Sequence, residues 1–253
     1  MTRLVFLGSA SATADQNHEN SSLAVVSSGY TILIDCVGSP LPVLNRAQIN
    51  LDSISDIILT HFHPDHVSGI PLLLLGMWLS GREKPIQIFG LDHTISRIKT
   101  LMDMYGWNNW PNFYPIYYKI ISDEKLQPVL SSKGINIIAS PVNHTIPTIG
   151  IRVELLEENL SFAYSSDTQP ADAVIELASR VDILIHEATG EGIGHSSPGQ
   201  AGEIASRAMA GELFLIHYPV IGVGMDEMLN KAREKFSGKV RLAEDYFQIE
   251  FSK

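Results

Sequence analysis

Short apolar runs alternate along the chain with segments of helical periodicity. The apolar runs are rich in Val, Ile and Leu, which indicates sheets that are buried on at least one face. We expect strands at residues 4–7, 23–27, 30–35, 56–59, 86–89, 116–121, 135–139, 149–155, 161–165, 182–185, 213–216, 240–243 and 246–251. The helical pattern predicts helices at residues 67–80, 93–105, 171–179, 198–209 and 225–236. This mixture favours an α/β fold in which helices flank two packed sheets, rather than one sheet.

Two of the predicted helices differ in how they begin. Ser197 is a good N-cap, and Pro198 suits the first helical position. The segment from Ala171 has no such side-chain cap, although Pro170 and Asp172 make a suitable first turn. The first residues, MTRLVFLGSASATAD, contain one basic residue and a short apolar run. They predict an edge strand and a turn rather than a signal peptide.

Composition narrows the class of protein. The 253 residues suffice for a large core and are few enough for one domain over residues 1–253. No apolar run approaches the roughly 20 residues of a membrane helix, so we expect no membrane partner. The single cysteine, Cys36, excludes an internal disulfide and fits the reducing cytoplasm.

The balance of charge bears on possible partners. Asp and Glu number 28 against 18 Lys and Arg, and the basic residues form no cluster. This distribution counts against a large nucleic acid, whose phosphates usually meet a basic face. A small phosphorylated substrate remains compatible, because bound metal ions can reverse the local sign of an acidic site.

The stretch THFHPDHVSG, residues 60–69, places metal-ligating side chains after a predicted strand. His61 and His63 would share one face of a continuing strand. Pro64 then stops the strand, and Asp65 is placed to cap a helix that begins near His66. The turn brings imidazoles and a carboxylate around one point, as zinc or a similar ion requires. The alternative, a histidine-rich surface loop, needs three of the nine histidines to fall within six positions by chance.

Three more polar residues end predicted strands further along the chain. His144 follows residues 135–142, Asp167 follows residues 160–164, and His217 follows residues 213–216. Strand ends are where α/β folds gather their sites. Each residue alone fits a turn or the edge of the core, but together with the first cluster they suffice for two metal ions.

This constellation resembles that of the metallo-β-lactamase superfamily. The resemblance is carried by the HxHxDH motif at residues 61–66, followed in order by His144, Asp167 and His217. It runs from residues 6–9 through residues 33–36 to the last strand. It implies an αββα sandwich with two metal ions in a cleft at the edge between the sheets.

The resemblance also implies a role for each ligand. One ion would be held by His61, His63 and His144 and the other by Asp65, His66 and His217, and Asp167 would bridge them. Asp35 is similar to the acid that orients a ligand histidine in this superfamily.

A narrower resemblance lies between Asp167 and His217. His186, Glu187, Ala188 and Thr189, followed by GHSS at residues 194–197, are similar to the HEAT motif and the later histidine of ribonuclease Z and its phosphodiesterase relatives. The resemblance implies that Glu187 orients His195 and that His195 assists at the scissile phosphate. The alternative is a strand end and a helix-capping loop without chemistry.

The chain departs from ribonuclease Z in one large feature. That enzyme commonly carries a long arm that holds tRNA, whereas only residues 145–166 separate His144 from Asp167 here. Residues 17–22 also lack the arginine that is usual there. We therefore expect a phosphodiesterase that acts on a nucleotide or cyclic phosphate through a metal-bridging hydroxide, with Asp65 as the residue that orients the water.

Other interpretations remain open. The same ligand set serves tRNA 3′ processing, lactone or thioester hydrolysis and, with iron, redox chemistry, and a metal-free scaffold is a further class. Zinc, manganese and iron all suit His and Asp ligands. Residues 105–118, with seven aromatic side chains, and Trp78 predict either packing, a homodimer contact or a lid that stacks a flat group.

Overall fold

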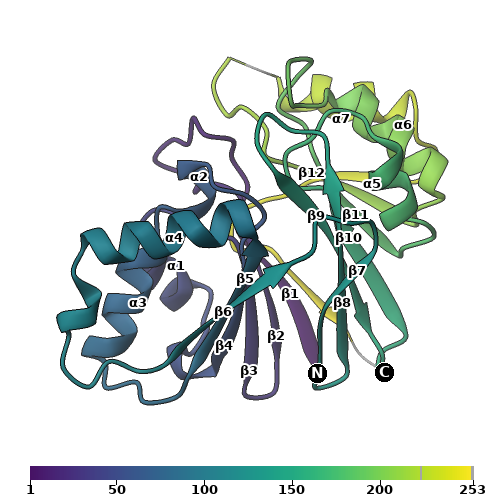
Figure 1. Ribbon diagram of the computed structural model, residues 1–253. Coiled ribbons are helices and arrows are strands. Elements are labelled where there is room, and N and C mark those ends of the chain that lie inside the picture. The colour runs from purple at the N-terminus through teal and green to yellow at the C-terminus, as the bar shows by residue number, and fades with distance from the viewer. Residues whose placement is uncertain (223, 252–253) are drawn as a thin grey trace.

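The computed structural model describes residues 1–222 and 224–251. Two β-sheets pack face to face, and helices cover the outer face of each sheet (Figure 1). This is the predicted αββα sandwich. The last described strand pairs with the first, since residues 248–251 lie antiparallel to residues 2–5.

The first sheet has the strand order β14-β1-β2-β3-β4-β5-β6. The strands from β14 to β3 are antiparallel, and those from β3 to β6 are parallel. Their bounds are Thr2–Gly8 (β1), Ser22–Ser27 (β2), Tyr30–Ile34 (β3), Ile54–Ile58 (β4), Ile86–Leu91 (β5), Ile116–Ile121 (β6) and Gln248–Phe251 (β14).

The second sheet repeats this mixed pattern in the order β13-β12-β11-β10-β9-β8-β7. Here the strands from β13 to β10 are parallel, and those from β10 to β7 are antiparallel. Their bounds are Gln127–Ser132 (β7), Ile135–Val142 (β8), Thr148–Leu155 (β9), Leu160–Tyr164 (β10), Ile183–Glu187 (β11), Glu212–Ile216 (β12) and Lys239–Leu242 (β13).

The helices form the outer layers. Those with the first sheet are Pro40–Arg46 (α1), Pro64–Val67 (α2), Ile70–Leu79 (α3) and Asp92–Met104 (α4). Those with the second sheet are Asp172–Leu177 (α5), Pro198–Ala208 (α6) and Met225–Arg233 (α7). Short 3₁₀ turns lie at Leu51–Ser53 and Trp107–Asn109.

The alternation of side chains along the strands produces separate apolar clusters. Phe6 of β1 faces the second sheet and stacks on Phe214 of β12, with ring centroids 5.2 Å apart. Its neighbours Val5 and Leu7 point the other way, into the cluster beneath the helices of the first sheet. The period of two therefore separates the core between the sheets from the core under the helices.

Several local predictions are confirmed and others are wrong. Ser197 caps α6 in a capping box with Gln200. The first strand is not at an edge, because β14 pairs with the outer side of β1. Asp65 does not cap α2, since that helix begins at Pro64 with His63 in the cap position.

The helix predicted over residues 67–80 is divided into α2 and α3. The break lies at Gly69, where an added Cβ would approach the backbone oxygen of Val37 to 2.7 Å. The amide of Gly69 donates to the carbonyl of Cys36 at 3.0 Å, so the chain that follows β3 packs against the break. The pattern also failed to predict α1 and β7, a short helix with two prolines and a half-exposed edge strand.

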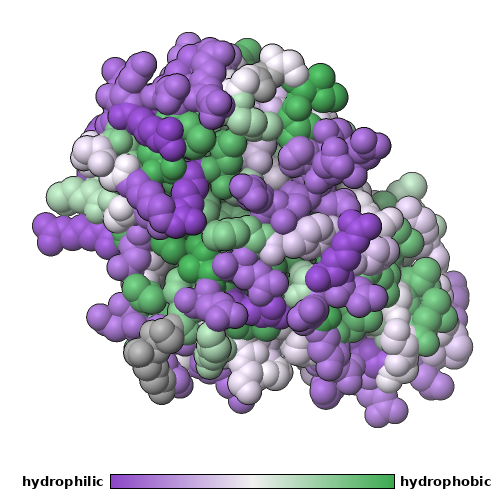
Figure 2. Space-filling view, turned by 180° about the vertical axis from the view of Figure 1, so that it is seen from behind, coloured by the Kyte–Doolittle hydropathy of each residue, from purple (hydrophilic) through white to green (hydrophobic). Residues whose placement is uncertain are grey.

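Figure 2 shows a mainly hydrophilic face on which apolar side chains form separate groups. Within residues 1–222 and 224–251, no helix combines the length and the apolar character needed to cross a membrane.

Candidate metal centre

The predicted ligands gather at one edge of the sandwich, where strands of both sheets end. His61 follows β4, Asp167 follows β10 and His217 follows β12. The backbone turns sharply at this edge: His217 has a φ of 52° and Asp35 a φ of 63°. Such left-handed backbone is uncommon outside glycine and is often found at functional sites.

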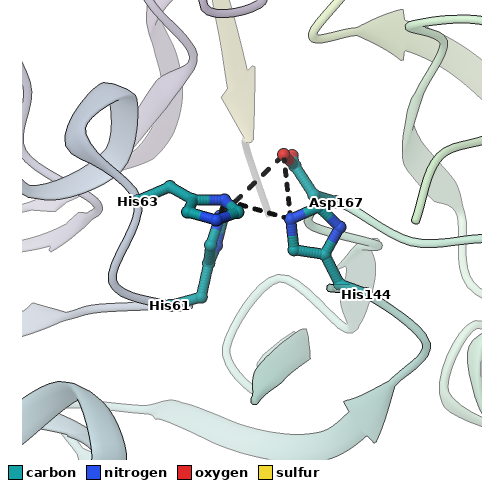
Figure 3. A group of neighbouring side chains, drawn as sticks. All are labelled: His61, His63, His144 and Asp167. Atoms are coloured by element: carbon teal, nitrogen blue, oxygen red, sulfur yellow. Dashed lines mark hydrogen bonds and ion pairs between the residues drawn. The ribbon is translucent and has the colours of Figure 1, made fainter. Parts of the chain in front are cut away.

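The side chains form two adjoining groups. In the first, the candidate ligand atoms of His61, His63, His144 and Asp167 all lie within 4.8 Å of one another (Figure 3). In the second, those of Asp65, His66 and His217 satisfy the same limit.

Asp167 lies between the two groups. Its Oδ1 is 3.5 Å from His66 Nε2, and its Oδ2 is 3.9 Å from His61 Nε2 and 3.5 Å from His217 Nε2. One carboxylate therefore faces the candidate ligands of both groups.

Neighbouring acceptors fix the orientation of two rings in the first group. His144 Nδ1 donates to the carbonyl oxygen of Gly194 at 2.7 Å. His61 Nδ1 donates to Thr60 Oγ1 at 3.0 Å, because the Thr60 hydroxyl gives its own hydrogen to Asp35. A neutral imidazole that donates from Nδ1 carries a lone pair on Nε2. Both Nε2 atoms thus present lone pairs to the group.

The second group is arranged in the same way. His66 Nδ1 donates to Asp35 Oδ2 at 2.8 Å. His217 Nδ1 donates to Thr189 Oγ1 at 2.9 Å, while the Thr189 hydroxyl donates to the carbonyl of His217 at 2.8 Å. When both rings are neutral, as metal binding requires, their Nε2 atoms, 3.4 Å apart, carry the lone pairs.

Converging lone pairs and carboxylates fit a cation. His61 Nε2 and His144 Nε2 both lie 3.1 Å from His63 Nδ1, and one hydrogen on His63 can satisfy only one of them. Asp167 Oδ1 is buried and has no hydrogen-bond partner among the described residues. Divalent ions that accept imidazole and carboxylate ligands would complete both groups.

The protonation behaviour of the buried groups agrees with this reading. Burial disfavours a charge on His66, but Asp167 and Asp35 outweigh burial and raise the pKa of His66 well above its usual value. Burial also opposes the charge of Asp167, yet His217 and His66 hold the pKa of this carboxyl well below its usual value. Burial lowers the pKa of His61 well below that of a free imidazole. The site therefore favours positive charge between the carboxylates while leaving His61 neutral, as a ligand must be.

Glu187 and His195 lie beside the two groups. Glu187 is fully buried, and its Oε1 lies 3.0 Å from His195 Nδ1. The same carboxylate accepts from the backbone amides of Thr168, Thr189 and Ser196 at 3.2, 2.8 and 3.0 Å. It thus ties together three segments at the site. The hydrogen bond that His195 donates to Glu187 raises the pKa of His195.

An open cavity of about 310 Å³ lies over the two groups. Its volume is at the lower end of the range for small-molecule sites. Among the described residues, its lining contains no Lys or Arg and consists of Ser11, Ala12, Thr13, His63, Asp65, Asp167, Thr189, His195, His217 and Pro219. A larger cavity of about 550 Å³ shares Thr189 and Pro219 with it, but its lining contains none of the candidate metal ligands.

The aromatic stretch lies elsewhere. Trp78 stacks on Trp110 with ring centroids 5.3 Å apart, and the Tyr114 hydroxyl donates to the carbonyl of Leu74 on α3. These contacts support the packing interpretation. Among the described residues that line the metal cavity, none comes from residues 105–118.

Sequence reasoning found the candidate ligands but missed residues that orient them. Thr60, Thr189 and Gly194 each accept a hydrogen bond from a candidate ligand histidine. Thr60 directly precedes His61, Thr189 ends the HEAT motif, and Gly194 begins the GHSS stretch. These positions beside or within the motifs are the sequence signal that could have identified them. Gly194 has a φ of 85°, and an added Cβ would approach His144 Nδ1 to 2.7 Å.

Replacing Asp35 with asparagine should weaken metal binding about 10- to 100-fold, the range typical of residues that orient ligands. Asp35 is fully buried and accepts from His66 Nδ1, from the Thr60 hydroxyl and from the Thr60 amide, so the substitution disturbs two candidate ligand histidines. Competition with a metal-chelating dye measures the affinity.

The matched control is Asp56→Asn. Asp56 is also a buried carboxylate of the first sheet, and it accepts from the Tyr30 hydroxyl and from Gln87 Nε2. We expect this variant to lose stability but to keep its metal affinity. Equal affinities in both variants would show that Asp35 does not orient the ligands.

Comparison with known proteins gives a consistent family assignment. Residues 2–240 match the family model described as Anti-Pycsar protein Apyc1. The ribonuclease Z of Mycobacterium bovis is 26% identical over 284 aligned positions, with 99% of this chain and 98% of that protein covered. Because this chain has 253 residues, the relative contains insertions that are missing here.

Two solved structures share the fold. The metallo-β-lactamase fold protein YhfI from Bacillus subtilis has a TM-score of 0.84 and 24% identity, with 98% of both chains covered. A diphosphatase from the PhnP family has a TM-score of 0.77 and 18% identity, with 100% of this chain and 98% of the other covered. At these identities the likeness concerns the fold.

Proposed function

The chain belongs to the family described as Anti-Pycsar protein Apyc1, and from its site we propose that it cleaves a small phosphodiester, such as a nucleotide or a cyclic phosphate. It is a metal-dependent hydrolase with the metallo-β-lactamase fold, similar to ribonuclease Z. The observation that carries the proposal is the pair of adjoining ligand groups that share Asp167 and lie under a small cavity.

The ligand groups suit two divalent ions. His61, His63 and His144 would hold one ion, and Asp65, His66 and His217 the other, with Asp167 between them. We favour zinc, because imidazole and carboxylate are its usual ligands, while manganese and iron accept the same donors. When bound, such a pair of ions lowers the pKa of water and stabilises the attacking and leaving oxygens of a phosphoryl displacement.

Asp65 and His195 are the catalytic residues in this proposal. Both line the cavity. Burial opposes the charge of Asp65, but the neighbouring His217 and His66 lower the pKa of this carboxyl, so it is ionised near neutral pH. It orients the attacking water and accepts its proton. His195, held through Nδ1 by Glu187, places Nε2 to donate a proton to the leaving oxygen.

The cavity and the charge favour a small substrate. The lining offers no Lys or Arg for a row of phosphates, and the chain has a net charge of −10. Residues 145–166 contain only the hairpin of β9 and β10 after His144, so no protruding arm lies there. The alternative, tRNA 3′ cleavage, is favoured by the full-length similarity to ribonuclease Z. Lactone or thioester hydrolysis uses the same kind of metal site.

Hydrolysis of bis(p-nitrophenyl) phosphate by metal-reconstituted protein tests the proposal. We expect metal-dependent cleavage that Asp65→Ala abolishes, with no turnover of a lactone. Cleavage of a lactone in place of the diester would overturn the proposal. Parallel assays with cyclic nucleotides and precursor tRNA separate the small substrate from the alternative.

Glu187→Gln should shift the alkaline limb of the pH–rate profile to lower pH. The carboxylate raises the pKa of His195, mainly through their hydrogen bond, and so keeps the ring protonated at higher pH. A general acid acts only while it is protonated, and its activity is lost as pH rises through its pKa. The measurement is kcat against pH at saturating metal. An unchanged alkaline limb would exclude His195 as the proton donor.

A homodimer remains a prediction. Helix α3 is apolar on nearly every side, and its Leu72 and Leu79 are 48% and 71% exposed. A helix of this kind suits a contact with a second copy of the chain. Light scattering after size-exclusion chromatography measures the state of assembly.

A further inference from the structure

One wall of the metal cavity comes from residues 9–21, which connect β1 to β2 and are called here the β1–β2 loop. Ser11, Ala12 and Thr13 line the cavity together with His195 and His217. The hydroxyls of Ser11 and Thr13 lie 3.4 Å apart. Residues 12–17 are exposed, so the tip of the loop has little packing of its own.

The hydroxyls of this wall are available to a substrate. The Thr189 hydroxyl, also in the lining, already donates to the carbonyl of His217. His195 Nδ1 is engaged with Glu187. Of the other polar side chains in the lining, all except those of Ser11 and Thr13 belong to candidate metal ligands. These two hydroxyls can therefore donate to the oxygens of a phosphodiester without giving up a bond to a candidate ligand.

The base of the loop is joined to the strand end that carries His217. The carbonyl of Ser9 accepts from the amide of His217 at 2.8 Å, and the amide of Ser11 donates to the carbonyl of Tyr218 at 3.0 Å. On the other side, Asn20 Nδ2 donates to the carbonyl of Ser11 at 2.7 Å. The loop thus begins and ends beside the metal centre.

Asp245 holds both ends of this loop from a distant part of the sequence. It lies between β13 and β14, and its Oδ1 accepts from the Ser9 hydroxyl at 2.7 Å. Its Oδ2 accepts from the backbone amide of Glu19 at 2.5 Å. One carboxylate therefore bridges the first and last turns of the loop, and charge-assisted bonds of this kind are the stronger ones.

We propose that Asp245 is a positioning residue that holds the β1–β2 loop so that the hydroxyls of Ser11 and Thr13 bind the oxygens of the substrate phosphodiester. The inference deepens the proposed function and rests on it. Asp245 acts through the loop and does not touch the substrate.

Loss of the Asp245 contacts should affect binding more than turnover. A released loop spends only part of its time in the binding position, and the apparent affinity is reduced to that fraction of its full value. If about one molecule in ten keeps the loop in place, KM rises about tenfold. The catalytic His195 and the candidate ligand His217 are held by other contacts: Glu187 fixes His195, and Thr189 fixes His217.

The test compares Asp245→Ala and Asp245→Asn with the control Asp182→Ala. Asp182 makes matching contacts, since its Oδ2 accepts from the amide and the hydroxyl of Ser161, at the start of β10. Each variant is assayed for kcat and KM with bis(p-nitrophenyl) phosphate at saturating metal, together with metal content and thermal stability.

We expect Asp245→Ala to raise KM about tenfold at full metal content, with kcat little changed. Asp245→Asn should recover part of the loss, because its amide oxygen still accepts from Glu19. Thr13→Val should also raise KM. Asp182→Ala should lower only the thermal stability. Kinetic constants of Asp245→Ala that match those of Asp182→Ala would overturn the inference, and so would a loss of metal that accounts for the whole change in KM.

Deuterium exchange of the backbone amides gives a readout that is independent of activity. Exchange in residues 9–21 should be faster in Asp245→Ala than in the wild type, whereas Asp182→Ala should leave it unchanged. Unchanged exchange in Asp245→Ala would overturn the positioning role. If the wild type cleaves no diester, the proposed function fails, while faster exchange still establishes that Asp245 holds the loop.

Discussion

Replacing Asp167 with asparagine should lower metal-dependent kcat/KM by more than about a hundredfold, the upper end for residues that only orient ligands. Asp167 faces ligands of both groups, and it is 2% exposed, so water cannot take over its role. The amide has the same shape but removes one negative charge from between four imidazoles. That charge helps to raise the pKa of His66 well above its usual value.

Metal analysis together with diester hydrolysis checks this expectation. The control is Asp172→Asn, which removes a carboxylate five residues away that is 77% exposed and paired with Arg207. Exposed pairs contribute little, so this variant should behave as the wild type. Full metal content and turnover in Asp167→Asn would show that Asp167 is not shared between the ions.

Removal of metal should produce the second large effect, a loss of thermal stability. Ligands that bind only the folded state stabilise it, by about 4 kcal/mol at a free concentration a thousand times the dissociation constant. For a domain of this size each kcal/mol corresponds to about 2–4 °C in Tm. We therefore expect Tm to fall by roughly 10 °C when a chelator removes the ions under such conditions.

The physical reason lies in the converging lone pairs. Without a cation, the nitrogens of His61 and His144 both compete for one hydrogen on His63, and Asp167 Oδ1 stays buried without a partner. Calorimetry with and without chelator measures the shift, and added zinc should reverse it. The Asp167→Asn protein serves as the control, since its Tm should respond weakly to either treatment. A wild-type Tm that changes with neither chelator nor zinc would exclude tight metal binding.

Much of the architecture could be predicted from the sequence because buried strands and amphipathic helices have simple periods. The apolar runs predicted most strands to within two residues, and Ser197 with Pro198 predicted the start of α6. The failures have local causes. A half-exposed strand such as β7 has a weak apolar signal, and the break at Gly69 depends on the approach of Val37. The organisation of residues 1–253 as one domain and the cytoplasmic location remain predictions.

The sequence by itself determined which residues could bind metal. The sequence shows directly which strands end in His, Asp or Glu, and these side chains can bind metal. The HxHxDH order is specific enough to identify the candidate ligands. We expected these residues to lie close together because α/β folds gather their sites at strand ends. Spacing cannot show, however, which acceptor holds each ring, because Thr60, Thr189 and Gly194 do so through contacts made only in the folded chain.

Only the tertiary structure decided how the site is enclosed. Asp245 lies 236 residues from Ser9 in the sequence, and no periodicity joins them. They meet because β14 pairs with β1, which brings the last part of the chain beside the first loop. Long-range pairing of this kind depends on the packing of the whole sandwich, so a local pattern predicts the candidate ligands but not the wall of the cavity above them.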